Sequence, residues 1–458
     1  MQRLDETQGD LFEGWIAPHL FELSEELRFA DRALSDPRIL DLFREEAATT
    51  GRPSTPIATY LRMMYLKIRY QMSYEVLVQE VSDSYKWRRF CHLPFSGKVP
   101  DDKTLIKLTG RFGEAKVKQV HDIVVRQAVE AKVLRGKKMR IDTTVVESNI
   151  RYPTDTGLLS DGVRVVTRTI KKIKKVVMFK TRFRNRMRSI KRRMILLAKF
   201  LKGKTAKAKG KFRKIKAQIL AIAQSVWDEA MKVLAELNSG QVKPKEGAST
   251  LSEVTLPLEL KHWLRLLKRI LEQTRIVLGG NVHIPDRLVS LFDTGARPIQ
   301  KGKAFPKTEF GRKVLIQEAE KGVVTDYQVH HESNPPDQPM LEPALNKHHD
   351  LFGHDPKEVA TDRGFHLTGQ DDHLHKRGVK HVSIPIRGHP NGHRKRTERS
   401  AWFRRLQRWR AAGEAKISLL KRKYGLRRTR VRANAPNEIA IGWGIITHNL
   451  LLIPKLGP

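Results

Sequence analysis

Three carboxylates could do chemistry in this otherwise strongly basic chain. Asp142 lies inside the β-branched run RIDTTVV, Asp362 ends the run EVATD, and Glu414 lies in a long basic stretch near the C-terminus. A carboxylate in or beside a buried strand is costly unless it is paired or bound to a metal ion. Mg²⁺ takes oxygen ligands, commonly one or two carboxylates with water and substrate phosphate. These acids therefore predict a divalent-cation site that meets a phosphodiester.

The charge of the whole chain favours a polyanionic partner. Its 458 residues include 88 Lys and Arg against 49 Asp and Glu, which gives a formal net charge of +39. Such a charge repels itself, and DNA would offset it with one phosphate charge per ~1.7 Å of duplex. Hydrophobic residues make up 40% of the chain, which is enough to build real cores. The composition therefore indicates a folded, nucleic-acid-binding protein and not a disordered basic tail.

Composition also argues against other classes of protein. The single cysteine, Cys91, excludes an internal disulfide and a multi-cysteine zinc site. The polar, acidic start MQRLDETQGDLFEGW is unlike a secretory signal or transit peptide. The apolar run 439–453 is interrupted by Thr447, His448 and Asn449 and is short for a membrane span. We expect that run to form a buried helix in a soluble protein without a membrane partner.

The stretch around Glu414 has helical spacing. Gln407, Arg410, Glu414 and Lys421 lie at i, i+3, i+7 and i+14, so they share one helix face. An adjoining apolar stripe would pack on a sheet and comprises Leu406, Trp409, Ile417, Leu420 and Tyr424. Glu414 would then face the strand ends, with Arg410 and Lys421 beside it to bind DNA phosphates. A solvent-exposed Arg–Glu–Lys ladder is the alternative interpretation of this spacing.

The elements that must position these acids indicate a mixed α/β fold. The first 135 residues predict short helices, with N-terminal caps at Thr55, Ser73 and Asp101. From residue 137 onward, strands and helices alternate. We expect a strand around Ile141, a hairpin of strands 312–319 and 323–330, a helix over 340–352, strands within 357–365 and 378–386, a basic loop at 387–399, and helices over about 402–424 and 437–452.

The segment 167–278 predicts a basic helical insertion into this fold. Between residues 170 and 216 every formally charged residue is Lys or Arg. We expect a loop at 202–211, followed by a long amphipathic helix that ends near residues 238–240. The one-sided charge favours contact with the DNA backbone over a merely solvated basic face. The residues expected to bind DNA are Arg182, Arg184, Arg186, Arg188, Lys191 and Arg192.

Taken together, these motifs resemble the DDE transposases of bacterial insertion sequences. The context of Asp142 is D-T-T, and Asp362 is followed by Arg363-Gly364-Phe365, as the second acid of that family is followed by x-G-F. The family's third acid lies in the pattern Y-x2-R-x3-E-x6-K, which Arg410, Glu414 and Lys421 match, with Gln407 at the Tyr position. The segments GRPSTPIATYLRMMYL through PDDKTLIKLTGRF and ESNIRYPTDTGLLSDGVR also resemble the family.

The resemblance implies an RNase H-like catalytic domain over 136–166 and 279–458, a helical DNA-binding domain over 1–135, and the insertion over 167–278. Asp142, Asp362 and Glu414 would be the catalytic residues and would hold two Mg²⁺ ions, or Mn²⁺. The implied reaction is DNA cleavage at the element ends and strand transfer into target DNA. The implied partners are terminal inverted repeats, target DNA and at least a second copy of the chain. The place of action would be the cytoplasm, at the bacterial nucleoid.

Two other functions fit the same residues. One is an RNase H-like DNA endonuclease that cuts without strand transfer, and the other is a noncatalytic, decayed DNA-binding protein. Glu398 is the rival for the third carboxylate, although it lies in a basic stretch without a helical partner pattern. Glu147, Asp155 and Asp326 are expected at the surface or in turns. The scattered histidines lack an H-E-x-x-H spacing and do not predict a zinc site.

Overall fold

The computed structural model describes residues 17–44, 55–201, 203, 205–239, 242–245, 250–300, 308–331 and 334–457. The chain divides into two compact units. The first unit comprises residues 1–149 and 311–458, and the second comprises residues 150–310. The division into three domains that the sequence indicates stays a prediction, because these units describe packing alone.

Short helices form the N-terminal part of the first unit. They are α1 (Glu25–Leu34), α2 (Pro37–Asp41), α3 (Ile57–Arg69), α4 (Tyr74–Asp83), α5 (Tyr85–Phe90) and α6 (Asp102–Glu130), preceded by the 3₁₀ turn η2 (Pro18–Leu20). The predicted caps at Ser73 and Asp101 are confirmed, since their side chains accept from the backbone N–H groups of Val76 and Thr104. The cap predicted at Thr55 is wrong, because Pro56 takes the N-cap position with an extended ψ of 145° and the helix begins at Ile57.

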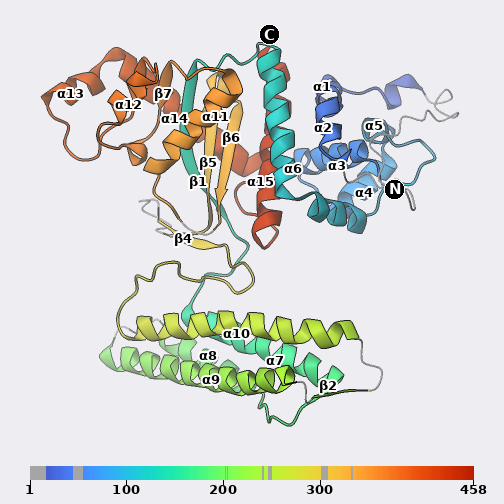
Figure 1. Cartoon of the computed structure of the whole chain (residues 1–458), viewed down its shortest axis with the longest axis vertical. Coiled ribbons are helices and arrows are strands. Elements are labelled where there is room, and N and C mark those ends of the chain that lie inside the picture. Colours follow the sequence, from blue (N-terminus) through green and yellow to red (C-terminus); the bar gives the residue numbers. More distant parts are fainter. Residues whose placement is uncertain are drawn as a thin grey trace. The chain divides into compact units, whose positions relative to one another are not determined.

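The C-terminal helix α15 (Asn434–Leu452) is the centre of this core. It packs along α6 and α3, as Figure 1 shows for α6 and α15. Trp443, Ile446 and Leu450 belong to the same buried cluster as residues of α1, α3 and α6. By length and composition alone the stretch Asn434–Leu456 could cross a membrane, but most of it is buried inside the protein. The expected buried helix is therefore confirmed, and it continues into the 3₁₀ turn η7 (Ile453–Leu456).

The first unit also contains a mixed sheet. Its strands are β1 (Lys138–Glu147), β5 (Glu309–Ala319), β6 (Val324–His330), β7 (Glu358–Ala360) and β8 (His381–Ser383). Among these strands the neighbours follow the order β5-β1-β7-β8, and β6 pairs with β5. The pairs β1–β5 and β5–β6 are antiparallel, whereas β1–β7 and β7–β8 are parallel. This arrangement confirms the mixed α/β class and is consistent with an RNase H-like catalytic domain.

The predicted hairpin is confirmed in β5 and β6. The turn between them, Glu320–Gly322 (η4), has positive φ angles of 67° at Lys321 and 79° at Gly322. Two successive residues with positive φ match the right-handed twist of the flanking strands, which is why hairpin turns favour glycine there.

Helices cover both faces of the sheet (Figure 1). Alternate residues of β1 point to opposite faces, so Met139 and Ile141 pack with α11 (Leu341–Phe352) and α12 (Gln370–Lys376). The turns η5 (Gln338–Met340) and η6 (Arg363–Phe365) lie on either side of α11 and β7 in sequence. On the other face, α14 (Ala401–Lys423) packs on β1, β7 and β8. The helix expected over 402–424 is thus confirmed.

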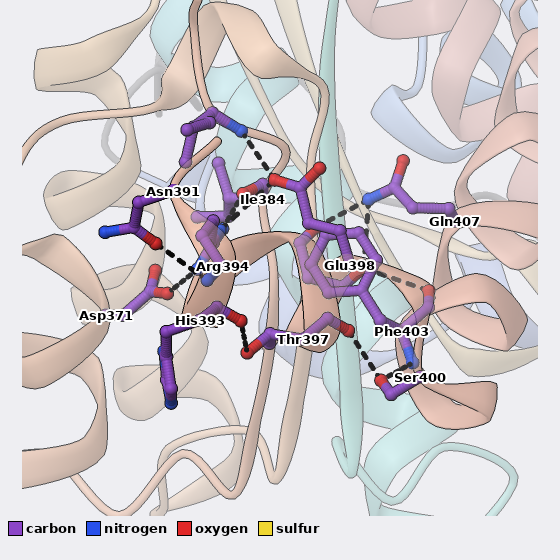
Figure 2. A network of polar contacts seen from close by, with 12 residues as sticks. Asp371, Ile384, Asn391, His393, Arg394, Thr397, Glu398, Ser400, Phe403 and Gln407 are labelled. Carbon is purple, nitrogen blue, oxygen red and sulfur yellow. Dashed lines mark hydrogen bonds and ion pairs between the residues drawn. The ribbon is translucent and has the colours of Figure 1, made fainter. Parts of the chain in front are cut away.

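The basic loop expected at 387–399 is partly wrong. Residues Gly392–Arg399 form helix α13, which Asn391 caps by accepting from the Arg394 N–H group. Within α13 no residue is apolar and none is buried, so the sequence shows no amphipathic pattern. Contacts from Arg394 to Asp371, Glu398 and the Ile384 carbonyl hold the helix instead (Figure 2).

The second unit is mainly helical. It contains α7 (Asp155–Val176), β2 (Val177–Met178), α8 (Met187–Phe200), α9 (Ala206–Asn238), β3 (Lys243–Pro244), α10 (Thr250–Leu278) and β4 (Arg297–Ile299). Apolar residues of α7, α8, α9 and α10 share one buried cluster. The expected long helix ending near residue 238 is confirmed. The loop expected at 202–211 is wrong from residue 206 onward, because Thr205 accepts from Ala208 N–H and starts α9 there. Residues 202 and 204 lie outside the described part of the chain.

Arg140 forms a buried ion pair within the sheet and also connects the sheet to α14. Arg140 of β1 donates to the Glu318 carboxylate at 2.6 Å and to the Trp409 carbonyl, and both charged side chains are nearly fully buried. The guanidinium also lies over the Trp409 ring, with 4.9 Å to the centroid. Gly413 makes room for this contact, since a Cβ there would lie 3.1 Å from Arg140 Nε.

We predict that Arg140→Met lowers the stability of the first unit by about 3–5 kcal/mol, because Glu318 then remains buried without its partner. Hydrogen exchange of the β1 and β5 amides measures this loss. The double variant Arg140→Met/Glu318→Met should recover most of it. Equal protection in the single variant and the natural protein would contradict the assignment.

Candidate active site at the carboxyl ends of β1 and β7

The parallel register of β1 and β7 brings two of the predicted acids to one edge of the sheet. Arg140 is paired with Ala360, so Asp142 and Asp362 each lie two residues beyond that pair on neighbouring strands. Neighbouring strands lie about 4.8 Å apart in the hydrogen-bonding direction. The two aspartates therefore follow the same direction to the same edge, and both are half-buried.

The turn after β7 holds Asp362 through its own backbone. Asp362 Oδ1 accepts from the Gly364 N–H group at 2.8 Å and starts the turn η6. A Cβ at Gly364 would lie 2.8 Å from both Asp337 Oδ2 and Asp362 Oδ1, so only glycine fits here without displacing a carboxylate. Arg387 donates to the carbonyls of Arg363 and Gly364 and fixes the turn from outside.

Asp142 lies beside the buried cluster of Arg140, Glu318 and Lys416. Its Oδ1 accepts from the Thr143 N–H group at 2.7 Å. Burial raises the pKa of Glu318 and the charge of Asp142 adds to this rise, whereas Arg140 and Lys416 oppose it. Burial lowers the pKa of Lys416, and Glu318 opposes that change. Glu318 is therefore influenced by the negative charge of Asp142 and by the positive charges of Arg140 and Lys416.

Gln407 joins α14 to the carboxyl ends of β7 and β8. Its Nε2 donates to the Thr361 carbonyl at 3.2 Å, the Ser383 carbonyl at 2.7 Å and the Ser383 hydroxyl at 3.0 Å. Gln407 therefore satisfies backbone acceptors next to Asp362.

Helix geometry places Glu414 on the same side of α14 as Gln407. Glu414 follows Gln407 by seven residues, and at ~100° per residue this rotation is about 20° short of two full turns, so the two side chains point in nearly the same direction. Lys416 lies on the opposite side of α14. Its Cε lies near Gly322, in the hairpin turn at the other end of the strands. Glu414 thus lies on the side of α14 nearer to the carboxyl ends of the strands.

Glu414 does not join the aspartates in one cluster. Among the described residues, no group of three or more His, Cys, Asp and Glu side chains could hold a metal ion. The Glu414 side chain is 65% exposed and binds Arg410 at 2.5 Å, whereas Arg410 is only 15% exposed. Lys421, on the same flank, is half-buried. The structure thus brings Asp142 and Asp362 together and leaves Glu414 paired with Arg410.

The rival acid Glu398 makes contacts that hold the local structure. It accepts from the Ile386 N–H group at 3.0 Å and pairs with Arg394 at 3.2 Å, as Figure 2 shows. Two of the acids expected at the surface are buried instead. Asp155 pairs with Lys216 and Arg287, and Asp326 pairs with Lys118, so their ion pairs explain why burial is tolerated.

The basic residues predicted in the insertion differ in their surroundings. Exposed residues of this set are Arg182, Arg184, Arg188, Lys191 and Arg192. Arg186 is half-buried and donates to both oxygens of Glu229, at 2.7 and 2.6 Å. Its guanidinium therefore serves the packing of the second unit, while the exposed residues remain candidates for DNA contact.

The structural roles of three residues near the aspartates were not predicted from the sequence. Gln407 and Arg387 act through hydrogen bonds to distant carbonyls, for which the sequence has no local pattern. Asp337 pairs with Lys313 at 2.6 Å and lies against Gly364. Only Gly364 gave a clue in the sequence. A glycine directly after Asp362-Arg363 indicates that another group approaches the backbone closely there.

We predict that Gln407→Leu destabilises the first unit by about 1–3 kcal/mol, because buried carbonyl oxygens lose their donor. Thermal unfolding of the purified variant measures the loss. Gln119→Leu, at an exposed glutamine of α6, is the matched control and should change stability little. Equal melting temperatures for the two variants would show that the Gln407 bonds do not matter.

Comparison with known proteins places the chain in a family. Residues 19–111 match the family described as Transposase domain (DUF772), and residues 281–450 match the family described as Transposase DDE domain. The relative "Uncharacterized protein ORF8 in nfe locus" of Rhizobium meliloti is 26% identical over 127 residues, or 27% of this chain and 61% of the relative. The chain thus spans about three fifths of that relative's length. No solved structure matches. The two family matches together cover more than half of the chain, which belongs to the DDE-type transposases of insertion sequences.

Proposed function

We propose that the protein cuts DNA at the ends of its mobile element in a metal-dependent reaction and joins the new 3′ ends to target DNA. The observation that supports this most is the register that brings Asp142 and Asp362 to one sheet edge. The family match adds the reaction class of DNA cutting and joining. Terminal inverted repeats and target DNA are the proposed substrates, and the cytoplasm, at the nucleoid, is the proposed place of action.

The donor set at this edge fits a divalent cation. Asp142 and Asp362 offer carboxylate oxygens, which Mg²⁺ and Mn²⁺ prefer, and Mg²⁺ is commonly held by one or two carboxylates together with substrate phosphate. Glu414 is the proposed third ligand, because it is exposed on the near flank of α14 and is held by a single surface ion pair with Arg410. When bound, two such ions supply Lewis-acid stabilisation of the attacking and leaving oxygens.

The side chains around the carboxylates have their own proposed tasks. Arg410 holds Glu414 in the absence of DNA, and its planar guanidinium can bind phosphate when DNA displaces that pair. Lys421 would contact the backbone farther along the same flank. Gln407 and Arg387 keep the strand end rigid, so that Asp362 does not move when phosphate arrives. The N-terminal helices would bind the inverted repeats. Joining two element ends would take at least two copies of the chain.

We predict that Asp142→Asn abolishes cleavage of element-end DNA in Mg²⁺ and leaves DNA binding nearly intact, since the charge that binds metal is lost and the basic surface is unchanged. Cleavage gels and a binding isotherm measure the two effects. Asp350→Asn, an exposed helix residue on α11, is the control. An Asp142→Asn protein that still cuts would refute the proposal. Cleavage by the natural protein without joined product would favour the endonuclease without strand transfer.

Glu414→Gln tests the choice of third carboxylate. Because the Glu414 side chain is 65% exposed, its substitution should leave the melting temperature unchanged while cleavage falls by orders of magnitude. Glu398→Gln should lower stability first, because it breaks the contacts to Ile386 and Arg394. Full cleavage by Glu414→Gln would remove Glu414 from the site.

A separate prediction concerns DNA binding by the basic second unit. Arg188→Ala and Arg192→Ala should each lower the slope of log K against log salt by about 0.9, the value of one phosphate contact. Arg186→Ala should leave the slope unchanged and lower stability, because its guanidinium binds Glu229. If Arg188→Ala and Arg192→Ala leave the slope unchanged, these arginines do not contact DNA phosphates.

A further inference from the structure

A trough lies on the outer face of α14, next to the strand ends where Asp142 and Asp362 lie. It has a volume of about 670 Å³ and is lined by Ala401, Arg404, Gln407, Arg408 and Ala411. Residues 401, 404, 408 and 411 are spaced i, i+3, i+7 and i+10, so they share one helix face. The lining thus combines small alanine side chains with two arginines.

The arginines of this trough differ from their neighbours on the same helix. Arg405 pairs with Glu358 at 2.7 Å, and Arg410 pairs with Glu414 at 2.5 Å. Arg404 and Arg408 are exposed and, within the described part of the chain, make no side-chain hydrogen bond or ion pair. Their charge is therefore available to a ligand.

Gln407 connects the trough to the candidate active site. Its side chain lines the trough, while its Nε2 donates to the carbonyl of Thr361, the residue before Asp362. Basic helix α13 immediately precedes α14 and is anchored inward by Arg394, as Figure 2 shows. Its residues Lys395, Arg396 and Arg399 are exposed and add positive charge to the segment that precedes α14.

We propose that this trough binds the phosphate backbone of the DNA strand that reaches Asp142 and Asp362, with Arg404 and Arg408 each contacting a phosphate. Arginine binds phosphate through two parallel N–H groups, and the two side chains are about 6 Å apart along the helix axis. The small alanines let the backbone approach closely. Such contacts carry no base information, so the same trough would accept element ends and target DNA. The proposal rests on the proposed function, because it gives the substrate's path to that site.

Disulfide cross-linking tests the path directly. The natural chain has one cysteine, Cys91, which is buried and whose thiol pKa burial raises, so an introduced cysteine is the reactive one. Ala411→Cys is placed in the Asp142→Asn protein and mixed with element-end DNA that carries a thiol tether on a phosphate near the cleavage position. We expect cross-linking about tenfold or more faster than for Lys347→Cys, an exposed control on α11 across the sheet.

Salt dependence gives the second readout. Arg404→Ala/Arg408→Ala should lower the salt slope of binding by about 1.8, or about 0.9 for each phosphate contact. Lys347→Ala/Lys376→Ala removes the same charge on the opposite face of the sheet and should leave the slope unchanged. Equal cross-linking of Ala411→Cys and Lys347→Cys, or equal slopes for the two double variants, would overturn the trough alone. Cleavage by Asp142→Asn would overturn the proposed function instead, so the two failures are distinguishable.

Discussion

The parallel pairing of β1 with β7 is the constraint on which the site depends. The pair Arg140–Ala360 fixes the register, and everything beyond it on the two strands reaches the same edge. A shift of one residue would turn Asp142 to the opposite face of the sheet, because side chains alternate along a strand. After the second unit the chain returns to the sheet in β5, which pairs with β1 from residue 311 onward.

Two polar contacts then position α14 over the sheet. Arg140, held by Glu318 of β5, donates to the Trp409 carbonyl of α14, and Gln407 of α14 donates to Ser383 and Thr361 at the strand ends. Together they determine which flank of the helix faces the aspartates. Buried polar contacts of this kind add little net stability, but they allow one orientation and oppose others. In this protein the orientation decides whether Glu414 and the trough arginines lie on the side of the carboxylates.

Local patterns predicted much of this fold, and long-range contacts explain what they missed. Periodicity and turn residues predicted the strand around Asp142, the hairpin, the caps at Ser73 and Asp101, and the helices α14 and α15. Helix α13 was missed because it has no apolar residue and depends on Arg394 binding Asp371, far away in sequence. The roles of Gln407 and Arg387 were missed for the same reason. Asp142 and Asp362 stood out in the sequence because an acid in a strand is costly, and their catalytic role stays a prediction. The ion pair of Glu414 with Arg410 has ordinary i, i+4 helix spacing.

We propose that Asp142 and Asp362 jointly hold the catalytic metal. Titration of Mn²⁺ into the protein–DNA complex, followed by calorimetry, measures this binding. We expect Asp142→Asn and Asp362→Asn each to lose the Mn²⁺ binding of the natural protein, while Asp350→Asn retains it. Mn²⁺ binding at natural affinity by either active-site variant would contradict the claim.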